Sequence, residues 1–329
     1  MRGVRPRRQQ GYVLIVVLGA LVLIALVAAR FAQRIDELRA QTSSLQVQAQ
    51  QRLATGNALA AALYLVTTQT LGPGGVGPPI GEPLLFADNR LYQLPDGGEV
   101  RLQDDRGLLP LNAVGRAQWR QVLSSLGVST AEVDGWIDVL QDYQDTDSLK
   151  RLSGAEAPDY AALGLPPPRN DWLVSVREVN RLPLWKDRPT VVEAIERIGS
   201  TSRFQVYNPN TTPIELLAML LPTATPQQLE LFDTLRRRAP FQSAASAQRA
   251  TGLAMERDDF MFHLGRQLRL TVSANGAPRA LQYNVTVVPG GSEAPWLISE
   301  AHPVFLHRTR DTPDRATPFP LADPKAAKP

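Results

Sequence analysis

Five carboxylates fall within residues 142–159, in the middle of the chain. They are Asp142, Asp145, Asp147, Glu156 and Asp159, and they follow a segment with helical periodicity. Clustered carboxylates repel one another unless a cation or basic side chains neutralise them. The chemistry that this cluster could support is therefore the binding of a hard metal ion, for which carboxylate oxygens are the preferred ligands.

The spacing of these acids differs from that of an EF-hand. Counting from Asp145, positions five and six are Leu149 and Lys150, where an EF-hand needs an acid and a glycine. Lys150 and Arg151 lie inside the same stretch and could pair with the acids. The residues alone leave two interpretations open, a cation site and a solvated acidic loop paired in part with these two bases.

The sequence offers little support for catalysis. It contains no cysteine, and its three histidines are His263, His302 and His307. No HExxH, GxSxG or Walker pattern occurs. We therefore expect a protein that is not an enzyme.

The positive charge of the chain is concentrated at its N-terminus. The formal net charge is +3, and residues 1–11 hold four arginines (Arg2, Arg5, Arg7 and Arg8) with no acid. The remainder has a net charge of −1 by the same count. This distribution argues against a nucleic-acid partner.

An uncharged apolar segment follows, from Tyr12 to Ala29. It is just long enough to cross a bilayer as a helix, and the preceding arginines should remain in the cytoplasm. The rest of the chain would then lie outside the cytoplasm. Residues 28–30, Ala-Ala-Arg, are a poor match for the small-x-small site of an ordinary signal peptide.

The apolar pattern continues beyond this segment in steps of three and four residues. Its members are Phe31, Ile35, Leu38, Thr42, Leu45, Ala49 and Leu53. No proline occurs between Pro6 and Pro73. The spacing predicts one helix from about Tyr12 to about Thr70, lipid-soluble at first and amphipathic afterwards.

The remaining chain predicts an α+β fold. A hairpin over residues 84–102 turns at Asp96-Gly97-Gly98, and a second covers 266–274 and 280–288. Helical periodicity dominates between them. We expect a long N-terminal helix packed on a small antiparallel sheet, with a large α-helical domain inserted into the sheet. The expected divisions are 1–11 (basic leader), 12–71 (long helix), 72–111 (first part of the sheet, opening on a flexible loop at 72–83), 112–264 (helical domain), 265–289 (second part of the sheet) and 290–329 (extended C-terminal segment, partly disordered).

Residues 208–213, Asn-Pro-Asn-Thr-Thr-Pro, have the composition of a turn that leads into a helix. Thr211 or Thr212 could cap that helix, with Pro213 at its first position. We expect this structural role rather than a loop that contacts a partner.

The basic leader, Gly11, the apolar helix and its amphipathic continuation resemble the type IV pilin and pseudopilin family. The resemblance implies cleavage by prepilin peptidase between Gly11 and Tyr12, followed by methylation of the new N-terminus. Most members begin with Phe or Met and carry Glu at the fifth mature position, where this chain has Tyr12 and Val16. The alternative is a plain signal anchor.

In lacking that glutamate and in having a large helical insertion, the chain resembles the K-type minor pseudopilins of type II secretion (GspK family). Local motifs occur in the order expected of that family. They are LQDDRGLLPLN (102–112), DVLQDYQDTDS (138–148), GAE (154–156), PPPRNDWLVSVREV (166–179), VYNPNTTPIELLAMLLP (206–222) and RRRAPFQS (236–243).

This resemblance implies a subunit at the tip of the secretion pseudopilus that initiates its assembly. The expected partners are the I- and J-type minor pseudopilins, with the H-type as a further candidate. The expected location is the bacterial inner membrane, crossed once, with most of the chain in the periplasm. The alternatives are a minor pilin of a type IV pilus system and a signal-anchored periplasmic enzyme.

The resemblance also favours a cation in the acidic loop, because K-type subunits bind calcium in their helical domain. It implies a structural calcium ion held by Asp145, Asp147 and Glu156, with Asp142 and Asp159 as further ligands.

Overall fold

A computed structural model describes residues 10–255, 258–305 and 316–320. The chain forms two compact units, and the boundary between them falls after Leu53. This boundary lies inside the first helix, α1 (Gln10–Thr68). The sequence-based prediction of one helix from about Tyr12 to about Thr70 is confirmed. The part of the basic leader before Gln10 lies outside the described residues.

The first unit is the N-terminal part of α1. Its described side chains from Tyr12 to Val27 are apolar or small and solvent-exposed. A helix that is apolar on all sides and buries none of these side chains is suited to a lipid environment.

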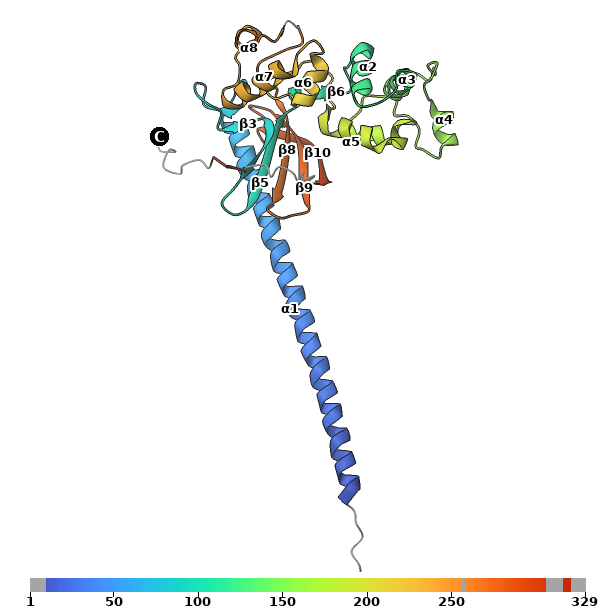
Figure 1. Ribbon diagram of the computed structural model, residues 1–329, viewed down its shortest axis with the longest axis vertical. Helices are drawn as coiled ribbons and strands as arrows, with labels where there is room; N and C mark the ends of the chain where they lie inside the picture. Colours follow the sequence, from blue (N-terminus) through green and yellow to red (C-terminus); the bar gives the residue numbers. More distant parts are fainter. Residues whose placement is uncertain (1–9, 256–257, 306–315, 321–329) are drawn as a thin grey trace, which may run out of the picture. The chain divides into compact units, whose positions relative to one another are not determined.

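The second unit contains a six-stranded sheet with the strand order β10-β9-β8-β5-β4-β11 (Figure 1). Neighbouring strands are antiparallel, except that β11 runs parallel to β4. The strands are β4 (Asp88–Gln93), β5 (Gly98–Asp104), β8 (Gln267–Ala274), β9 (Arg279–Val287), β10 (Trp296–Phe305) and β11 (Thr317–Pro318). Both predicted hairpins, β4 with β5 and β8 with β9, are present.

The C-terminal part of α1, from Ala54 onwards, packs on one face of this sheet. Buried side chains of α1, such as Ala58 and Val66, join a core with Val100 of β5 and Leu270 of β8. The helix comes so close that a side chain at Gly98 would lie 2.7 Å from the carbonyl oxygen of Ala54. The small residues of α1 and β5 therefore set the separation between helix and sheet.

Three short strands follow α1 and form a small separate sheet in the order β1-β2-β3. They are β1 (Thr70–Leu71), β2 (Gly75–Gly77) and β3 (Leu85–Phe86). The prediction of a flexible loop over residues 72–83 was wrong for this part. Gly75 pairs with β3 and is buried. A side chain there would lie 2.4 Å from the carbonyl oxygen of Leu85.

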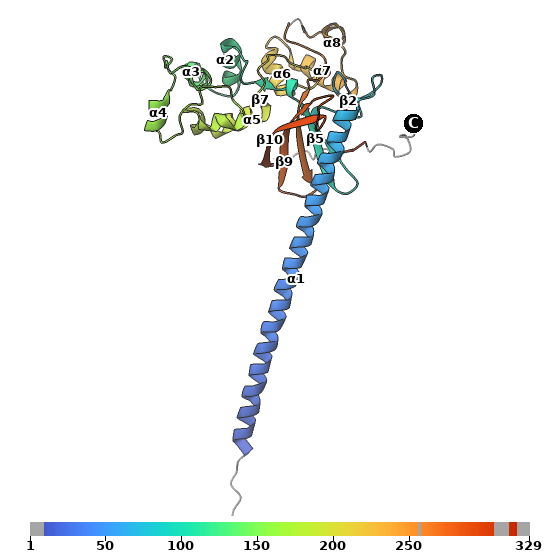
Figure 2. The ribbon, with the colours of Figure 1, turned by 180° about the vertical axis from the view of Figure 1, so that it is seen from behind.

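In sequence, the helical domain is inserted between β5 and β8. In space, it lies beyond one end of the large sheet (Figures 1 and 2). Its helices are α2 (Arg116–Ser125), α3 (Val133–Gln144), α4 (Ala157–Ala162), α5 (Pro189–Ile198), α6 (Ile214–Leu220), α7 (Pro226–Arg238) and α8 (Ala244–Thr251). The 3-10 helices are η1 (Asp105–Gly107), η2 (Val176–Arg181) and η3 (Trp185–Asp187), and a two-residue parallel pair joins β6 (Leu109–Pro110) to β7 (Gly199–Ser200).

Two apolar cores hold this domain together. The larger one packs α2, α3 and α5 around three buried tryptophans, and Trp185 contacts Trp119 and Trp136 at ring-centroid distances of 5.8 and 5.1 Å. A smaller core joins α6, α7 and α8, with Phe232 stacked on Phe241. Trp172 differs from the other three, because 41 % of it is exposed.

The sheet extends further towards the C-terminus than the expected boundary at residue 289. Strand β10 pairs along β9, and Thr317–Pro318 pairs with β4. Phe319 is buried against Tyr92, so this part of the expected disordered segment is an ordered piece of the core. Pro303 within β10 made a strand difficult to predict, but an edge strand tolerates proline. Residues 306–315 and 321–329 lie outside the described residues.

Candidate functional site

The predicted processing site lies within α1. Gly11 and Tyr12 are both helical, and Tyr12 is 76 % exposed. Val16, the fifth residue from Tyr12, is 53 % exposed. An 18-residue window of this helix has a mean hydropathy of 3.0 and is not buried at all. By length and composition, α1 can cross a membrane once.

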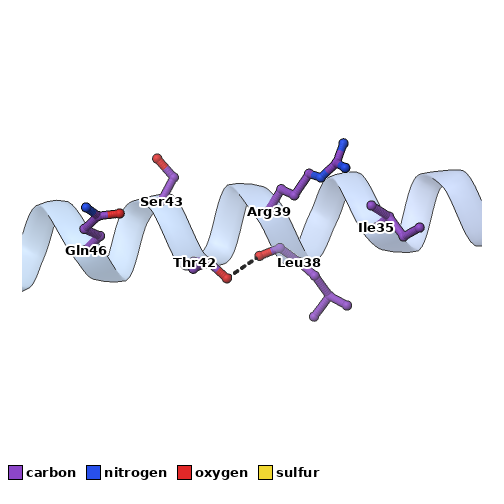
Figure 3. Close-up of a pocket in the computed structure, with 6 residues that line it drawn as sticks. All are labelled: Ile35, Leu38, Arg39, Thr42, Ser43 and Gln46. Atoms are coloured by element: carbon purple, nitrogen blue, oxygen red, sulfur yellow. Dashed lines mark hydrogen bonds between the residues drawn. The ribbon is translucent and has the colours of Figure 1, made fainter.

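The amphipathic stripe that follows is also uncovered. Phe31, Leu38 and Leu45 are each at least half exposed. Figure 3 shows the side chains from Ile35 to Gln46 on this single helix, with the Thr42 hydroxyl donating to the Leu38 carbonyl oxygen over 2.8 Å. Because one helix supplies all the side chains of this hollow, enclosing it would require a second element.

The acidic loop begins at the C-terminal end of α3. Asp142 is fully buried there and accepts a 2.5 Å hydrogen bond from Nη1 of Arg151. The same nitrogen donates to Asp145. The backbone NH of Arg151 also donates to Oδ2 of Asp142, over 3.2 Å. Arg151 thus neutralises two of the five predicted ligands.

Asp159 is also engaged. Its Oδ1 accepts from Nζ of Lys150 at 2.7 Å, and its Oδ2 accepts from the backbone NH of Glu156 at 2.9 Å, just before α4. The hydrogen bond from Lys150 is the main reason that the pKa of Asp159 is lowered. Asp159 therefore pairs with Lys150 and accepts a backbone hydrogen bond at the start of α4. This pairing agrees with the interpretation in which the basic residues of the loop neutralise its acids.

Glu156 differs from the other acids of the loop. It is 4 % exposed, and its carboxylate faces the backbone NH groups at the start of α4, but neither oxygen makes a well-aligned hydrogen bond and neither has a basic partner. Burial raises its pKa, and the nearby charges of Asp142, Asp145 and Asp147 raise it further. An unpaired buried carboxylate close to three others is a feature that a bound cation would stabilise.

Three further oxygens of described residues near this loop have no partner: Oδ1 of Asp145, Oδ1 of Asn170 and the hydroxyl of Tyr160. Asn170 has a positive φ of 52°, and its side-chain amide donates to the carbonyl oxygen of Asp147. Asn170 was not among the site residues predicted from the sequence. Its signal was the Asn-Asp pair after three prolines, since Asn tolerates left-handed backbone better than most residues.

The donor set fits a hard cation, although the ligands are not gathered around one point. Every unpartnered atom named here is an oxygen, as calcium requires. Within the described ranges, however, no three acidic or histidine side chains converge closely enough to form a metal cage. Arg151 would have to release Asp145 before that carboxylate could serve as a ligand. A hollow of about 350 Å³ beside it, lined in part by Asp171 and Trp172, leaves room for such a rearrangement.

A second polar cluster joins the helical domain to the sheet. Asp104, at the end of β5, is fully buried and accepts hydrogen bonds from the Asn208 amide (3.0 Å), the Thr211 hydroxyl (3.1 Å) and the Gly265 backbone NH (3.1 Å). Burial raises its pKa despite these donors. The cluster brings together residues that are more than one hundred positions apart in sequence.

The expected helix cap at Thr211 or Thr212 was wrong. Thr212 donates to the carbonyl oxygen of Asn208, and α6 begins at Ile214 without a side-chain cap. The hydroxyl of Thr211 donates to the carboxylate of Asp104 instead. The long-range partner satisfies the hydroxyl better than a local cap would, because it lets a buried carboxylate keep a donor. Both threonines are buried, which also excludes them from a partner-contacting surface.

Comparison with known proteins agrees with this architecture. Residues 96–196 match the family model described as type II secretion system (T2SS), protein K. This range begins at the β4–β5 turn and ends in α5, so it includes the acidic loop. The family is a structural component of the secretion system and is not a known enzyme family. No curated protein matches the chain.

The fold is similar to a chain in the crystal structure of the GspK-GspI-GspJ complex from the type 2 secretion system of enterotoxigenic Escherichia coli. The TM-score is 0.52 at 15 % sequence identity, and the match covers 82 % of this chain and 99 % of the other. Residues 96–196 are therefore similar to protein K of the type II secretion system, and the chain shares its α+β fold with a chain of that solved complex.

Proposed function

We propose that this protein is the tip subunit of the type II secretion pseudopilus, where it initiates assembly with the I- and J-type minor pseudopilins and thereby supports export of folded proteins. The observation that carries the proposal is the combination of an uncovered apolar helix with a bulky helical domain beyond one end of the sheet. A helix exposed in this way needs lipid or other helices around it. The similar structure was solved with GspI and GspJ, which supports the same kind of partners here.

The N-terminus supports this position. Prepilin peptidase would cut between Gly11 and Tyr12, and the retained helix would hold the subunit in the inner membrane with its bulk in the periplasm. In related subunits a glutamate at the fifth mature position pairs with a neighbour's terminal amine. Val16 cannot make this contact, which suits a subunit with no neighbour above it. The protein would act by assembly and would not be a catalyst.

The first test is the mass of the N-terminal peptide of the protein isolated from its own membrane. A peptide that begins with methylated Tyr12 is expected. A peptide that begins at Met1 or after Ala29 would overturn the processing step and favour a signal anchor. Replacement of Gly11 by Val should block cleavage, and replacement of Gly19, which meets no neighbouring atom within 4 Å, by Ala is the matched control.

Co-purification then separates the type II secretion role from a type IV pilus role. The full chain, extracted in detergent, should bring down the I- and J-type minor pseudopilins of its own secretion system. Recovery of type IV pilus subunits instead would overturn the assignment of partners.

We also propose that the acidic loop binds a structural calcium ion through Glu156, Asp145 and Asp147, with Asp142 as a further ligand. The unpartnered oxygens of Glu156 and Asp145 support this proposal. Asp142 and Asp159 are the weaker candidate ligands, since both oxygens of each already accept hydrogen bonds. A bound calcium ion would supply positive charge to the loop and no chemistry beyond structural stabilisation.

Calorimetric titration of the full chain with calcium should give saturable heat and a raised melting temperature. Glu156→Gln should abolish both effects, whereas Asp187→Asn, an exposed acid outside the loop, should leave them unchanged. An absence of heat and of any shift in the wild-type protein would leave Arg151 and Lys150 as the only neutralising groups and refute the calcium site.

A further inference from the structure

α1 covers only part of one face of the six-stranded sheet. On β5 and β8, the side chains on this face are almost fully buried, as Leu102 and Val272 show. Exposure rises towards the other edge of the same face. Leu281 of β9 is 38 % exposed, and Ile298 and Phe305 of β10 are 37 % and 68 % exposed.

The strand register shows that these residues share one face. Val272 of β8, which belongs to the core beneath α1, is paired with Leu281, and Leu281 is paired with Pro303. Paired residues of adjacent strands point to the same side of a sheet. We define the β9–β10 patch by its five members of this face: Leu281, Ile298, Ala301, Pro303 and Phe305.

The patch continues an interface that the protein already makes. The core under α1 runs without interruption from β5 through β8 to Val285 and Val287 of β9. The patch adjoins those residues on the same side and carries the same kind of side chain. Its only charged neighbour on this face of β9 and β10 is Arg279, whose guanidinium lies 4.9 Å from the ring centroid of Phe305.

The spacing suits a second helix next to α1. Ala54 and Ala58 of α1 lie against Gly98, which places this part of the helix over β5. Strand β9 is two positions from β5 in the sheet. Two strand spacings amount to about 9–10 Å, which is the usual distance between the axes of packed helices. A helix over β9 and β10 would therefore contact both α1 and the patch.

We propose that the β9–β10 patch is the docking surface for the amphipathic N-terminal helix of a partner minor pseudopilin, whose small and aliphatic stripe would lie between α1 and the edge of the sheet. The inference rests on the proposed function, since that function supplies the partner. It adds the surface of this chain that the partner would occupy. A helix is the better occupant than a strand, because the exposed apolar area is a face of the sheet and not only its edge.

The test measures binding of the full chain in detergent to the I-type and J-type minor pseudopilins, each alone and both together. Phe305→Asp and Ala301→Asp place a charge in the patch and should weaken binding by at least about tenfold. Leu297→Asp is the matched control. Leu297 lies on the same strand and is 60 % exposed, but it points to the opposite face. Its substitution should change the dissociation constant by less than about twofold. Melting curves of each variant verify that the fold is retained.

A second experiment uses the absence of native cysteine. The Ala301→Cys protein is paired with a series of single cysteines along the N-terminal helix of the partner, and disulfide formation is measured. Cross-linking that recurs every three to four residues supports a docked helix. Alternation at every second residue indicates a docked strand, and an absence of cross-links at all positions also overturns the proposal.

These results distinguish a failure of the proposed function from a failure of the docking surface. If the wild-type chain binds neither partner, the proposed function fails. If it binds and the patch variants bind equally well, only the docking surface is refuted. If the chain alone forms a dimer by light scattering, and Phe305→Asp abolishes that dimer, the occupant is a second copy and the proposal of a pseudopilin partner is overturned.

Discussion

The carboxylate of Asp142 occupies the space in which a side chain at Gly154 would lie. A Cβ atom at Gly154 would come within 1.8 Å of Oδ2 of Asp142. The buried acid at the end of α3 and the glycine that precedes α4 are therefore matched in size. This contact explains why a glycine is required in the GAE segment (154–156), one of the motifs that resemble the K-type family.

Gly154→Ala should destabilise the helical domain, because neither the backbone nor the buried carboxylate can move aside without losing hydrogen bonds. Overpacking of this kind costs about 1–3 kcal/mol. Urea denaturation of the full chain is the measurement. Gly115→Ala is the control, since a side chain there would meet no atom within 4 Å. Equal stability of the two variants would show that the loop rearranges freely around Asp142.

Arg151→Gln should lower the melting temperature of the protein in the presence of a chelator. Asp142 would then keep a buried charge without its cationic partner. Since Arg151 is itself partly exposed, we expect a loss of about 1–2 kcal/mol, below that of a fully buried pair. Calcium should restore more stability to this variant than to the wild-type protein.

The control for Arg151 is Arg188→Gln, which breaks an exposed pair with Glu132 at 3.5 Å. This change should leave the melting temperature almost unchanged, because solvent screens an exposed pair. If calcium fails to stabilise the Arg151 variant, the cation and the guanidinium are not interchangeable in this loop.

Asp105 should make the stability of the protein depend on pH. Burial raises its pKa to about 6 in the folded state, compared with an ordinary value of 3.8. A carboxyl whose pKa is raised by folding holds its proton more tightly in the folded state. The free energy of unfolding therefore falls as the pH rises through this window, by at most about 3 kcal/mol.

Asp105→Asn should flatten the stability profile between about pH 4 and pH 6. Glu82→Gln, which changes an exposed acid, should retain the wild-type slope. Denaturation curves at half-unit pH intervals measure both. A wild-type stability that rises with pH in this window would contradict the expected sign.

Phe319→Ala should weaken the packing at the β4 edge of the sheet. Phe319 is 6 % exposed, and its ring meets that of Tyr92 edge-to-face at a centroid distance of 6.4 Å. Loss of a buried phenylalanine side chain costs about 3–5 kcal/mol. Thr317→Ala, an exposed change two residues earlier, should have little effect. A stable Phe319→Ala protein in denaturant would show that the C-terminal segment is not part of the core.

Local sequence patterns were sufficient to predict the long helix and both hairpins. The helix follows from apolar spacing, and the hairpins follow from alternation around glycine turns such as Gly97 and Gly276. The same reasoning missed β10, because Pro303 and Glu300 interrupt the pattern of a strand. Phe319 was missed too, because it lies between two prolines and its packing partner, Tyr92, is more than two hundred residues away.

The residue types of the candidate site could be predicted from the sequence, but the ion pairs and hydrogen bonds between them could not. The cluster of acids, and the two bases able to neutralise them, could be identified from residue types. Which acid is paired with which base depends on how α3 and α4 pack together. The role of Thr211 could not be found locally either, since its carboxylate partner, Asp104, lies on the sheet.

The chain leaves the large sheet after Asp104 and returns near Gly265, and the backbone NH of Gly265 donates to Asp104 over 3.1 Å. The two ends of the inserted segment are therefore joined by this hydrogen bond. Because both ends are held together, the register of β5 against β8 does not depend on the length of the inserted segment. Lineages could enlarge, shrink or exchange the helical domain as a module while the sheet and its long helix stay unchanged.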